Sequence, residues 1–78
     1  MIVLYQWEPC PYCKMVRDTL AELNLSYEVV EVPRERERRA AVYRISRQYT
    51  VPVLTDDGEV IVDEEKIIPY LERKYARR

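Results

Sequence analysis

The stretch Cys10-Pro11-Tyr12-Cys13 constrains the fold more than any other part of this sequence. It follows a short apolar run of strand-forming residues, Ile2–Gln6, and it precedes apolar positions that recur at helical spacing as far as Leu23. Pro11 suits the first position of a helix, because its φ is already fixed and its missing N–H would have no intrahelical partner. The sequence therefore predicts a strand followed by a helix that begins at the cysteines and ends at Asn24.

The rest of the chain divides at prolines, at turn residues and at changes of hydrophobic period. Pro33 ends a second apolar run, and Asp56-Asp57-Gly58-Glu59 separates two further runs as a hairpin turn does. Asp63 is the expected N-cap of the last helix, since its carboxylate can accept free backbone N–H groups. The predicted elements are strands at 27–32, 51–55 and 60–62, a helix at 34–48 and a helix after 63.

The predicted order of elements is βαβαββα. A βαβ unit gives parallel strands, and the closing hairpin adds an antiparallel strand. We therefore expect an α/β fold of the thioredoxin-like kind, with a mixed four-stranded sheet and helices on both faces. Residues 1–78 suffice for one domain.

Composition excludes several classes of function. The chain has 13 basic and 14 acidic side chains, a net charge of −1, so nothing global predicts binding to nucleic acid or to an anionic membrane. Residues 1–5 lack a basic start and a long apolar segment, so we expect no secretory signal and a cytoplasmic location. We also expect a monomer. With no histidine and only two cysteines, the sequence predicts no metal site.

Two cysteines separated by two residues at the start of a helix indicate thiol chemistry. Cys10 would be the N-cap, where its thiolate can accept hydrogen bonds from the backbone N–H groups of Tyr12 and Cys13 and where the helix dipole favours negative charge. Thiols in such positions ionise more readily than ordinary cysteines. Cys13 would lie close enough to attack a mixed disulfide on Cys10. Half a zinc site is the first alternative, and it lacks two ligands. A static disulfide is the second, and so short a loop gains little stability from it.

The motif Cys10-Pro11-Tyr12-Cys13 resembles the active-site signature of glutaredoxins. Ile2-Val3-Leu4-Tyr5 resembles the first strand of that family, and Thr50-Val51-Pro52 resembles its threonine-valine-cis-proline element. The stretch from Val62 to Ile68 is similar to the start of the last helix of glutaredoxins and of the N-terminal domain of glutathione S-transferases. The resemblance covers the whole chain.

The resemblance implies a thiol–disulfide oxidoreductase that reduces protein disulfides or glutathione mixed disulfides. Glutathione would be the reducing co-substrate, with no bound cofactor. Cys10 would be the nucleophile and Cys13 the resolving thiol. Pro52 would be cis, and the backbone of Val51 would pair with the substrate. Tyr12 would form part of the groove wall.

The resemblance also implies how glutathione would be bound. Backbone N–H groups of Asp63 and Glu64 would hold the γ-glutamyl carboxylate at a helix N-terminus. Gln48 would lie near the glycine carboxylate. We further expect Trp7 to flank the groove and Arg44 and Arg47 to approach the anionic tripeptide. The arginines of residues 34–39 are expected on a solvated helix face with pairs at i,i+3 and i,i+4.

Three departures from the family pattern keep other readings open. Many glutaredoxins have a lysine before the motif, where this chain has Gln6-Trp7-Glu8, and a glycine pair where it has Ile61-Val62. Glu64 could repel the glutathione carboxylate. The alternative is a redoxin of the same fold that is reduced by a flavoprotein reductase. A third reading is a non-enzymatic module that binds glutathione or bridges an iron–sulfur cluster. A full glutathione S-transferase is not expected, because the chain ends where the helical second domain of those enzymes would begin.

Overall fold

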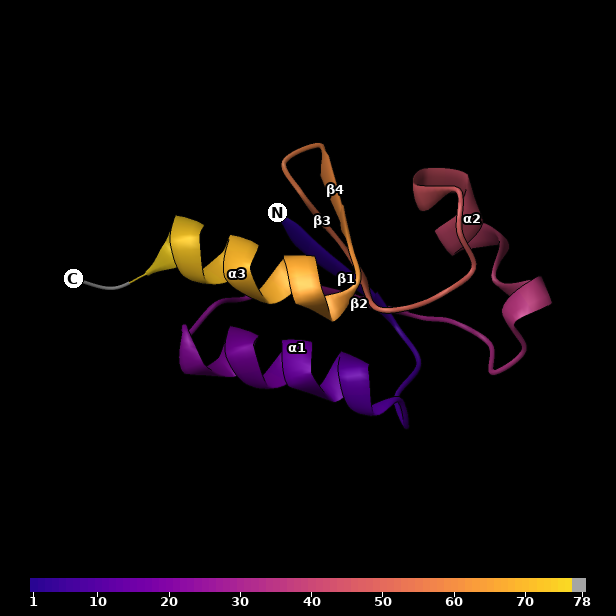
Figure 1. Cartoon of the computed structure of the whole chain (residues 1–78), viewed down its shortest axis with the longest axis horizontal. Coiled ribbons are helices and arrows are strands. Elements are labelled where there is room, and N and C mark those ends of the chain that lie inside the picture. Colours follow the sequence, from indigo (N-terminus) through magenta and orange to yellow (C-terminus); the bar gives the residue numbers. More distant parts are fainter. Residues whose placement is uncertain (77–78) are drawn as a thin grey trace.

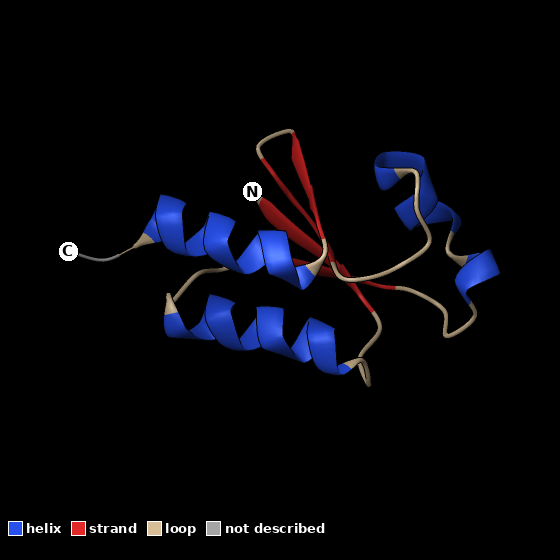
Figure 2. Ribbon diagram, in the orientation of Figure 1, coloured by secondary structure: helices blue, strands red, loops and turns tan. Residues whose placement is uncertain are grey.

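The computed structural model describes residues 1–76 and contains one mixed sheet (Figure 2). Its order is β2-β1-β3-β4. β1 pairs with β2 in parallel and with β3 antiparallel, and β3 forms a hairpin with β4. The predicted thioredoxin-like α/β fold is confirmed. The strands are β1 (Ile2–Gln6), β2 (Glu28–Glu31), β3 (Val53–Asp56) and β4 (Glu59–Val62).

Helices cover both faces of the sheet, as predicted. α1 (Pro11–Glu22) and α3 (Glu64–Tyr75) lie side by side on one face, and α2 (Ala40–Ser46) lies on the other (Figure 1). No helix within residues 1–76 is long and apolar enough to span a membrane.

Two apolar clusters hold these layers together. The larger cluster joins α1 and α3 to the central strands, and the smaller one joins α2 to the opposite face. Burying each such side chain contributes roughly 1.5–3 kcal/mol to stability. The buried members of the larger cluster are Ile2, Leu4, Val16, Leu20, Leu54, Ile67 and Leu71, and those of the smaller cluster are Val32, Val42 and Val53.

The predicted helix at 34–48 is wrong in its first half. A short 3-10 helix, η1 (Arg36–Arg38), precedes α2, and Arg39 between them leaves helical geometry at φ −94° and ψ 58°. Arg39 turns inward, where its guanidinium donates hydrogen bonds to the carbonyl oxygens of three residues. Residues 34–38 offer no apolar side chain to the core, so this buried arginine, rather than a helical face, fixes the local backbone.

Candidate active site

The two cysteines begin α1 in different environments. Cys10 is the N-cap residue with φ −71° and ψ 123°, and its side chain is half-buried. Cys13, one turn into the helix, is 0% exposed. The backbone N–H of Cys10 donates to the carbonyl of Trp7 (2.9 Å), which forms the turn that leads into the helix. Both cysteines are free thiols.

Burial sets the chemistry of Cys13. Burial raises the pKa of the Cys13 thiol to about 12, the backbone of Trp7 lowers it in part, and a hydrogen bond with Cys10 raises it further. Cys13 therefore stays protonated at neutral pH, and the accessible sulfur is that of Cys10. The expected capping bond from the Cys10 side chain is absent within residues 1–76.

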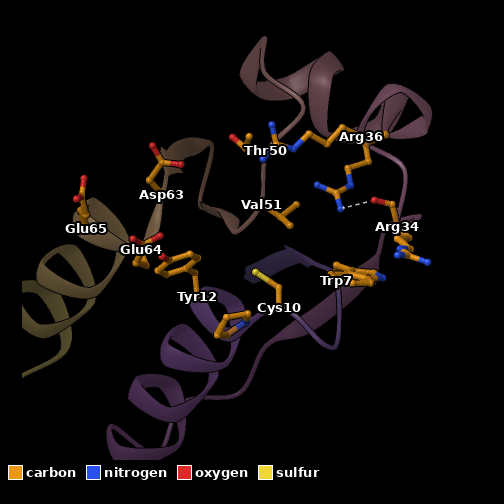
Figure 3. Close-up of a pocket in the computed structure, with 12 residues that line it drawn as sticks. Trp7, Cys10, Tyr12, Arg34, Arg36, Thr50, Val51, Asp63, Glu64 and Glu65 are labelled. Carbon is orange, nitrogen blue, oxygen red and sulfur yellow. Dashed lines mark hydrogen bonds between the residues drawn. The ribbon is translucent and has the colours of Figure 1, made fainter.

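A cleft of about 670 Å³ opens above Cys10. We call it the thiol cleft. Its volume lies within the range of about 300–1,000 Å³ typical of small-molecule sites. Figure 3 shows Cys10 with Val51 above it and Tyr12 and Trp7 to either side. The lining residues are Trp7, Cys10, Pro11, Tyr12, Arg34, Arg36, Arg39, Thr50, Val51, Asp63, Glu64 and Glu65.

The thiol cleft is polarised. Carboxylates of Asp63, Glu64 and Glu65 lie at one end, near the start of α3 (Figure 3). Arg34 and Arg36 enter from the opposite side, from which Arg36 extends toward Thr50. A ligand that spans Cys10 therefore meets negative side chains at one end and positive side chains at the other.

Several residues predicted from the sequence lie together here. Cys10, Tyr12, Val51 and Glu64 all line the thiol cleft, together with Asp63. Tyr12 is 54% exposed at the rim.

Val51 and the proline that follows it form the loop above Cys10. The peptide bond between Val51 and Pro52 is cis, as expected. The Pro52 side chain is fully buried and does not line the cleft. Neither backbone hydrogen-bonding group of Val51 has a partner within residues 1–76, so both are free for a ligand.

Asp63 is the N-cap residue of α3, as predicted, at φ 70°. The predicted capping bond from its carboxylate is absent from the described chain. Its backbone N–H donates to the carbonyl of Pro52 (3.1 Å) and is therefore not free for a ligand. At the start of α3, the backbone N–H groups that have no partner in the described chain are those of Glu64 and Glu65. Glu65 was not predicted, because the resemblance pointed to the two residues before it.

Gln48 lies behind the thiol cleft and does not line it. Its side-chain amide donates to the hydroxyl of Thr50 (2.7 Å) and to the carboxylate of Asp63 (3.4 Å). Gln48 thus links the Val51 loop to the start of α3.

The arginines of the cleft are not the predicted ones. Arg44 and Arg47 line a separate cleft outside α2, so the expectation that they approach the tripeptide is wrong. Arg34, Arg36 and Arg39 line the thiol cleft in their place. The alternation of arginine and glutamate at 34–39 suggested a solvated helix, but the segment forms one such pair, Arg38 to Glu35 at 3.7 Å.

A polar network supports the turn before Cys10. The Arg17 guanidinium donates to the side-chain oxygen of Gln6 and to the carbonyl of Glu8. Gln6 in turn donates to Glu31, whose carboxylate also accepts from the backbone N–H of Glu8. The Glu8 carboxylate is exposed and lies 4.0 Å from Arg17, which partly neutralises it.

Comparisons with known proteins agree with this geometry. Residues 4–78 match the family described as glutathione S-transferase, N-terminal domain. A glutaredoxin-like 8.6 kDa protein of the rubredoxin operon of Clostridium pasteurianum is 33% identical over 66 residues, which are 85% of this chain and 88% of that protein.

Solved structures give the same result. Glutathione transferase E6 from Drosophila melanogaster superposes with a TM-score of 0.85 and 39% identity, over 100% of this chain and 36% of the transferase. A glutathione transferase homologue from Drosophila mojavensis, solved with bound glutathione, gives 0.83 and 30% over 97% of this chain and 36% of its own. The chain thus spans about a third of these transferases. It belongs to the thioredoxin-like family that unites glutaredoxin-like proteins with the N-terminal domains of glutathione S-transferases.

Proposed function

We propose that residues 1–78 act as one glutaredoxin-like domain that reduces protein disulfides or glutathione mixed disulfides with electrons from glutathione. The observation that supports this most directly is the pairing of an accessible sulfur, Cys10, with a fully buried one, Cys13, at the base of a polarised cleft. A dithiol enzyme needs this division, because one thiol must meet the substrate and the other must act only afterwards.

The reaction on a glutathione mixed disulfide needs only the first thiol. The Cys10 thiolate attacks the glutathione sulfur of the substrate disulfide, a new S–S bond forms, and the protein thiolate leaves. A second glutathione thiolate then attacks the glutathione sulfur held on Cys10. That step releases oxidised glutathione and regenerates the Cys10 thiolate, so two electrons pass from glutathione to the substrate.

The reaction on a protein disulfide needs both thiols. Cys10 attacks one substrate sulfur and forms a mixed disulfide, and the other substrate sulfur leaves as a thiolate. Cys13 then loses its proton to that thiolate or to solvent and attacks Cys10. The products are a reduced substrate and a Cys10–Cys13 disulfide, which two glutathione molecules reduce.

The charges of the thiol cleft suit zwitterionic glutathione. The free N–H groups of Glu64 and Glu65 would hold the γ-glutamyl carboxylate, and the carboxylate of Asp63 would attract its ammonium group. Arg34 and Arg36 would attract the glycine carboxylate at the opposite end. The free backbone groups of Val51 would pair with the cysteinyl residue between them.

A redoxin of the same fold, reduced by a flavoprotein reductase, is the second candidate. The observation that favours it is the acidic end of the cleft, since Glu64 and Glu65 oppose an incoming carboxylate.

The glutaredoxin-like proposal also includes a monomeric protein that acts in the cytoplasm on disulfide-bonded or glutathionylated proteins.

The test is turnover of a glutathione mixed disulfide by the purified protein, with NADPH consumption as the readout. One arm supplies glutathione and glutathione reductase, and the other supplies thioredoxin reductase. We expect turnover in the first arm. Turnover confined to the second arm would support the second candidate. An absorbance scan after anaerobic purification separates both from an iron–sulfur-bridging module.

A further inference from the structure

The segment around η1 and α2 is strongly basic. Residues 34–48 contain six arginines and two glutamates, a net charge of +4 in a chain whose total charge is −1. The rest of the chain therefore has a net charge of −5, although its last six residues, 73–78, contain four further basic side chains.

Four of these arginines have no charged partner in the structure. Arg38 pairs with Glu35, and Arg39 is buried on backbone carbonyls. The other four are exposed, and none has a carboxylate within 4.0 Å in the described part of the chain. They are Arg34, Arg36, Arg44 and Arg47.

A second cleft, of about 360 Å³, lies among these arginines outside α2. Tyr43 and Tyr49 stack across it, with ring centroids 4.7 Å apart and an angle of 17° between the rings. The guanidinium of Arg47 lies 5.9 Å from the centre of the Tyr43 ring. Arg44 completes the basic side of the cleft. The stacked rings hold Arg47 in place, so it loses less rotamer freedom when it binds an anion.

The second cleft lies next to the thiol cleft. Arg36, Arg39 and Thr50 line the thiol cleft, and the residues next to them in the chain, Glu37, Ala40 and Tyr49, line the second cleft. The two clefts therefore lie on either side of the same two backbone segments, residues 36–40 and 49–50. A peptide that is bound at Cys10 and extends across these segments would leave the thiol cleft near Arg36 and enter the cleft lined by Arg44 and Arg47.

We propose that Arg36, Arg44 and Arg47, with Tyr43 and Tyr49, form a docking surface for an acidic segment next to the reactive cysteine of a protein substrate. We call these five residues the arginine surface. The inference deepens the proposed function, on which it rests, by naming a class of protein substrate: disulfide-bonded or glutathionylated proteins with aspartate or glutamate flanking the cysteine. Charge complementarity favours this partner.

An acidic protein segment fits this surface better than a nucleic acid does. The basic region is short, and the remaining net charge of −5 would repel a long polyanion that extends beyond it. A short acidic peptide segment can stay within the basic region. The adjoining thiol also acts on disulfides, which proteins supply and nucleic acids do not.

The test compares two glutathionylated peptides that differ only in whether aspartates or lysines flank the cysteine. The charge-reversal variant is Arg44→Glu, and the matched control is Arg73→Glu, an exposed arginine on α3 that also has no carboxylate within 4.0 Å in the described chain. The third substrate is the mixed disulfide of glutathione and 2-mercaptoethanol, which is too small to extend beyond the thiol cleft to Arg44 and Arg47.

We expect Arg44→Glu to lower kcat/KM for the aspartate peptide by about 3- to 10-fold, the effect of losing one or two exposed ion pairs and adding one repulsion. The loss should shrink in high salt. The small mixed disulfide should turn over as in the wild type, and Arg73→Glu should match the wild type on all three substrates.

Two results would overturn the proposal. One is equal kcat/KM values for both peptides in the wild type. The other is an Arg44-dependent affinity for a fluorescent single-stranded oligonucleotide without discrimination between the peptides, which would assign the surface to nucleic acid. Absence of turnover even with the small mixed disulfide would instead contradict the proposed function, so the two failures are distinguishable.

Discussion

The backbone N–H of Asp63 donates a hydrogen bond of 3.1 Å to the carbonyl oxygen of Pro52. This bond ties the start of α3 to the loop above Cys10, and the Gln48 amide strengthens the link by reaching Thr50 and the Asp63 carboxylate. The geometry of the acidic end of the thiol cleft therefore depends on the Val51 loop. The free donors there belong to Glu64 and Glu65, whose own side chains are acidic.

Glu64→Ser should lower KM for glutathione with little change in kcat. The Glu64 carboxylate lines the thiol cleft, and a like charge close to a binding site opposes a bound carboxylate. A change in KM alone is the signature of altered ground-state binding. Steady-state kinetics at low and high salt measures the effect, which should shrink as salt rises. Glu72→Ser, an exposed change further along α3, is the control. An unchanged KM would mean that Glu64 does not act on bound glutathione.

Cys10 should be alkylated much faster than Cys13 near neutral pH. Cys10 is half-buried at the cleft, whereas Cys13 is fully buried and burial raises its pKa to about 12. Mass spectrometry of partially labelled protein measures the ratio. Equal labelling, or faster labelling of Cys13, would reverse the assignment of nucleophile and resolving thiol.

The raised pKa of Cys13 also predicts how the stability of the reduced protein depends on pH. A thiol whose pKa rises from 9.0 to about 12 on folding binds its proton more tightly in the native state. Its contribution to stability is fully present below about pH 9 and is lost as pH rises toward 12. Urea unfolding between pH 8 and 10.5, in a non-thiol reductant, should show a steeper loss for the wild type than for Cys13→Ser. Parallel curves would contradict this prediction.

Arg39→Met should destabilise the protein by roughly 2–4 kcal/mol, because it leaves three partly buried carbonyls without donors. The Arg39 guanidinium donates to the carbonyls of Pro33 (2.8 Å), Arg34 (3.0 Å, the dashed line in Figure 3) and Tyr49 (3.1 Å). Urea denaturation gives the loss, and Arg38→Met, an exposed neighbour, is the control. Arg39→Lys should restore only part of the stability, since an ammonium group cannot reproduce the fork of donors. A loss no larger than that of Arg38→Met would contradict this structural role.

The buried Asp56 should matter for stability and not for thiol chemistry. Burial opposes ionisation of its carboxyl, but hydrogen bonds from Tyr75, Lys74 and Tyr70 outweigh burial and lower its pKa. A lowered pKa contributes stability above the unfolded value of about 3.8, and this is lost as pH falls through the native value. Tyr75→Phe should cost about 1–2 kcal/mol at pH 7 and leave turnover unchanged. A change in turnover at unchanged stability would show that the network reaches the thiol cleft.

Much of the fold could be predicted because its residues follow simple patterns. The period of α1, the hairpin turn before β4 and the prolines at 11 and 33 each indicate their element locally. The division between Cys10 and Cys13 also follows from helix geometry, since Cys13 shares the apolar face of Val16 and Leu20.

Other features could not be predicted because they depend on contacts between distant segments. A buried arginine is rare, so the alternating arginines and glutamates of residues 34–38 gave no indication that Arg39 turns inward. The loss of the helix before α2 follows from that burial. The position of Gln48 depends on the hydroxyl of Thr50 in the same loop and on the carboxylate of Asp63, which lies at the start of α3.

The most direct test of the account is turnover of a glutathione mixed disulfide, with glutathione and glutathione reductase, by the wild type, Cys13→Ser and Cys10→Ser. We predict that the wild type and Cys13→Ser both turn over this substrate, because only the Cys10 sulfur is needed for it, and that Cys10→Ser has no activity. Cys13→Ser should lose most of its activity only when the substrate is a protein disulfide. Activity of Cys10→Ser equal to that of the wild type, or loss of all turnover in Cys13→Ser, would contradict the account.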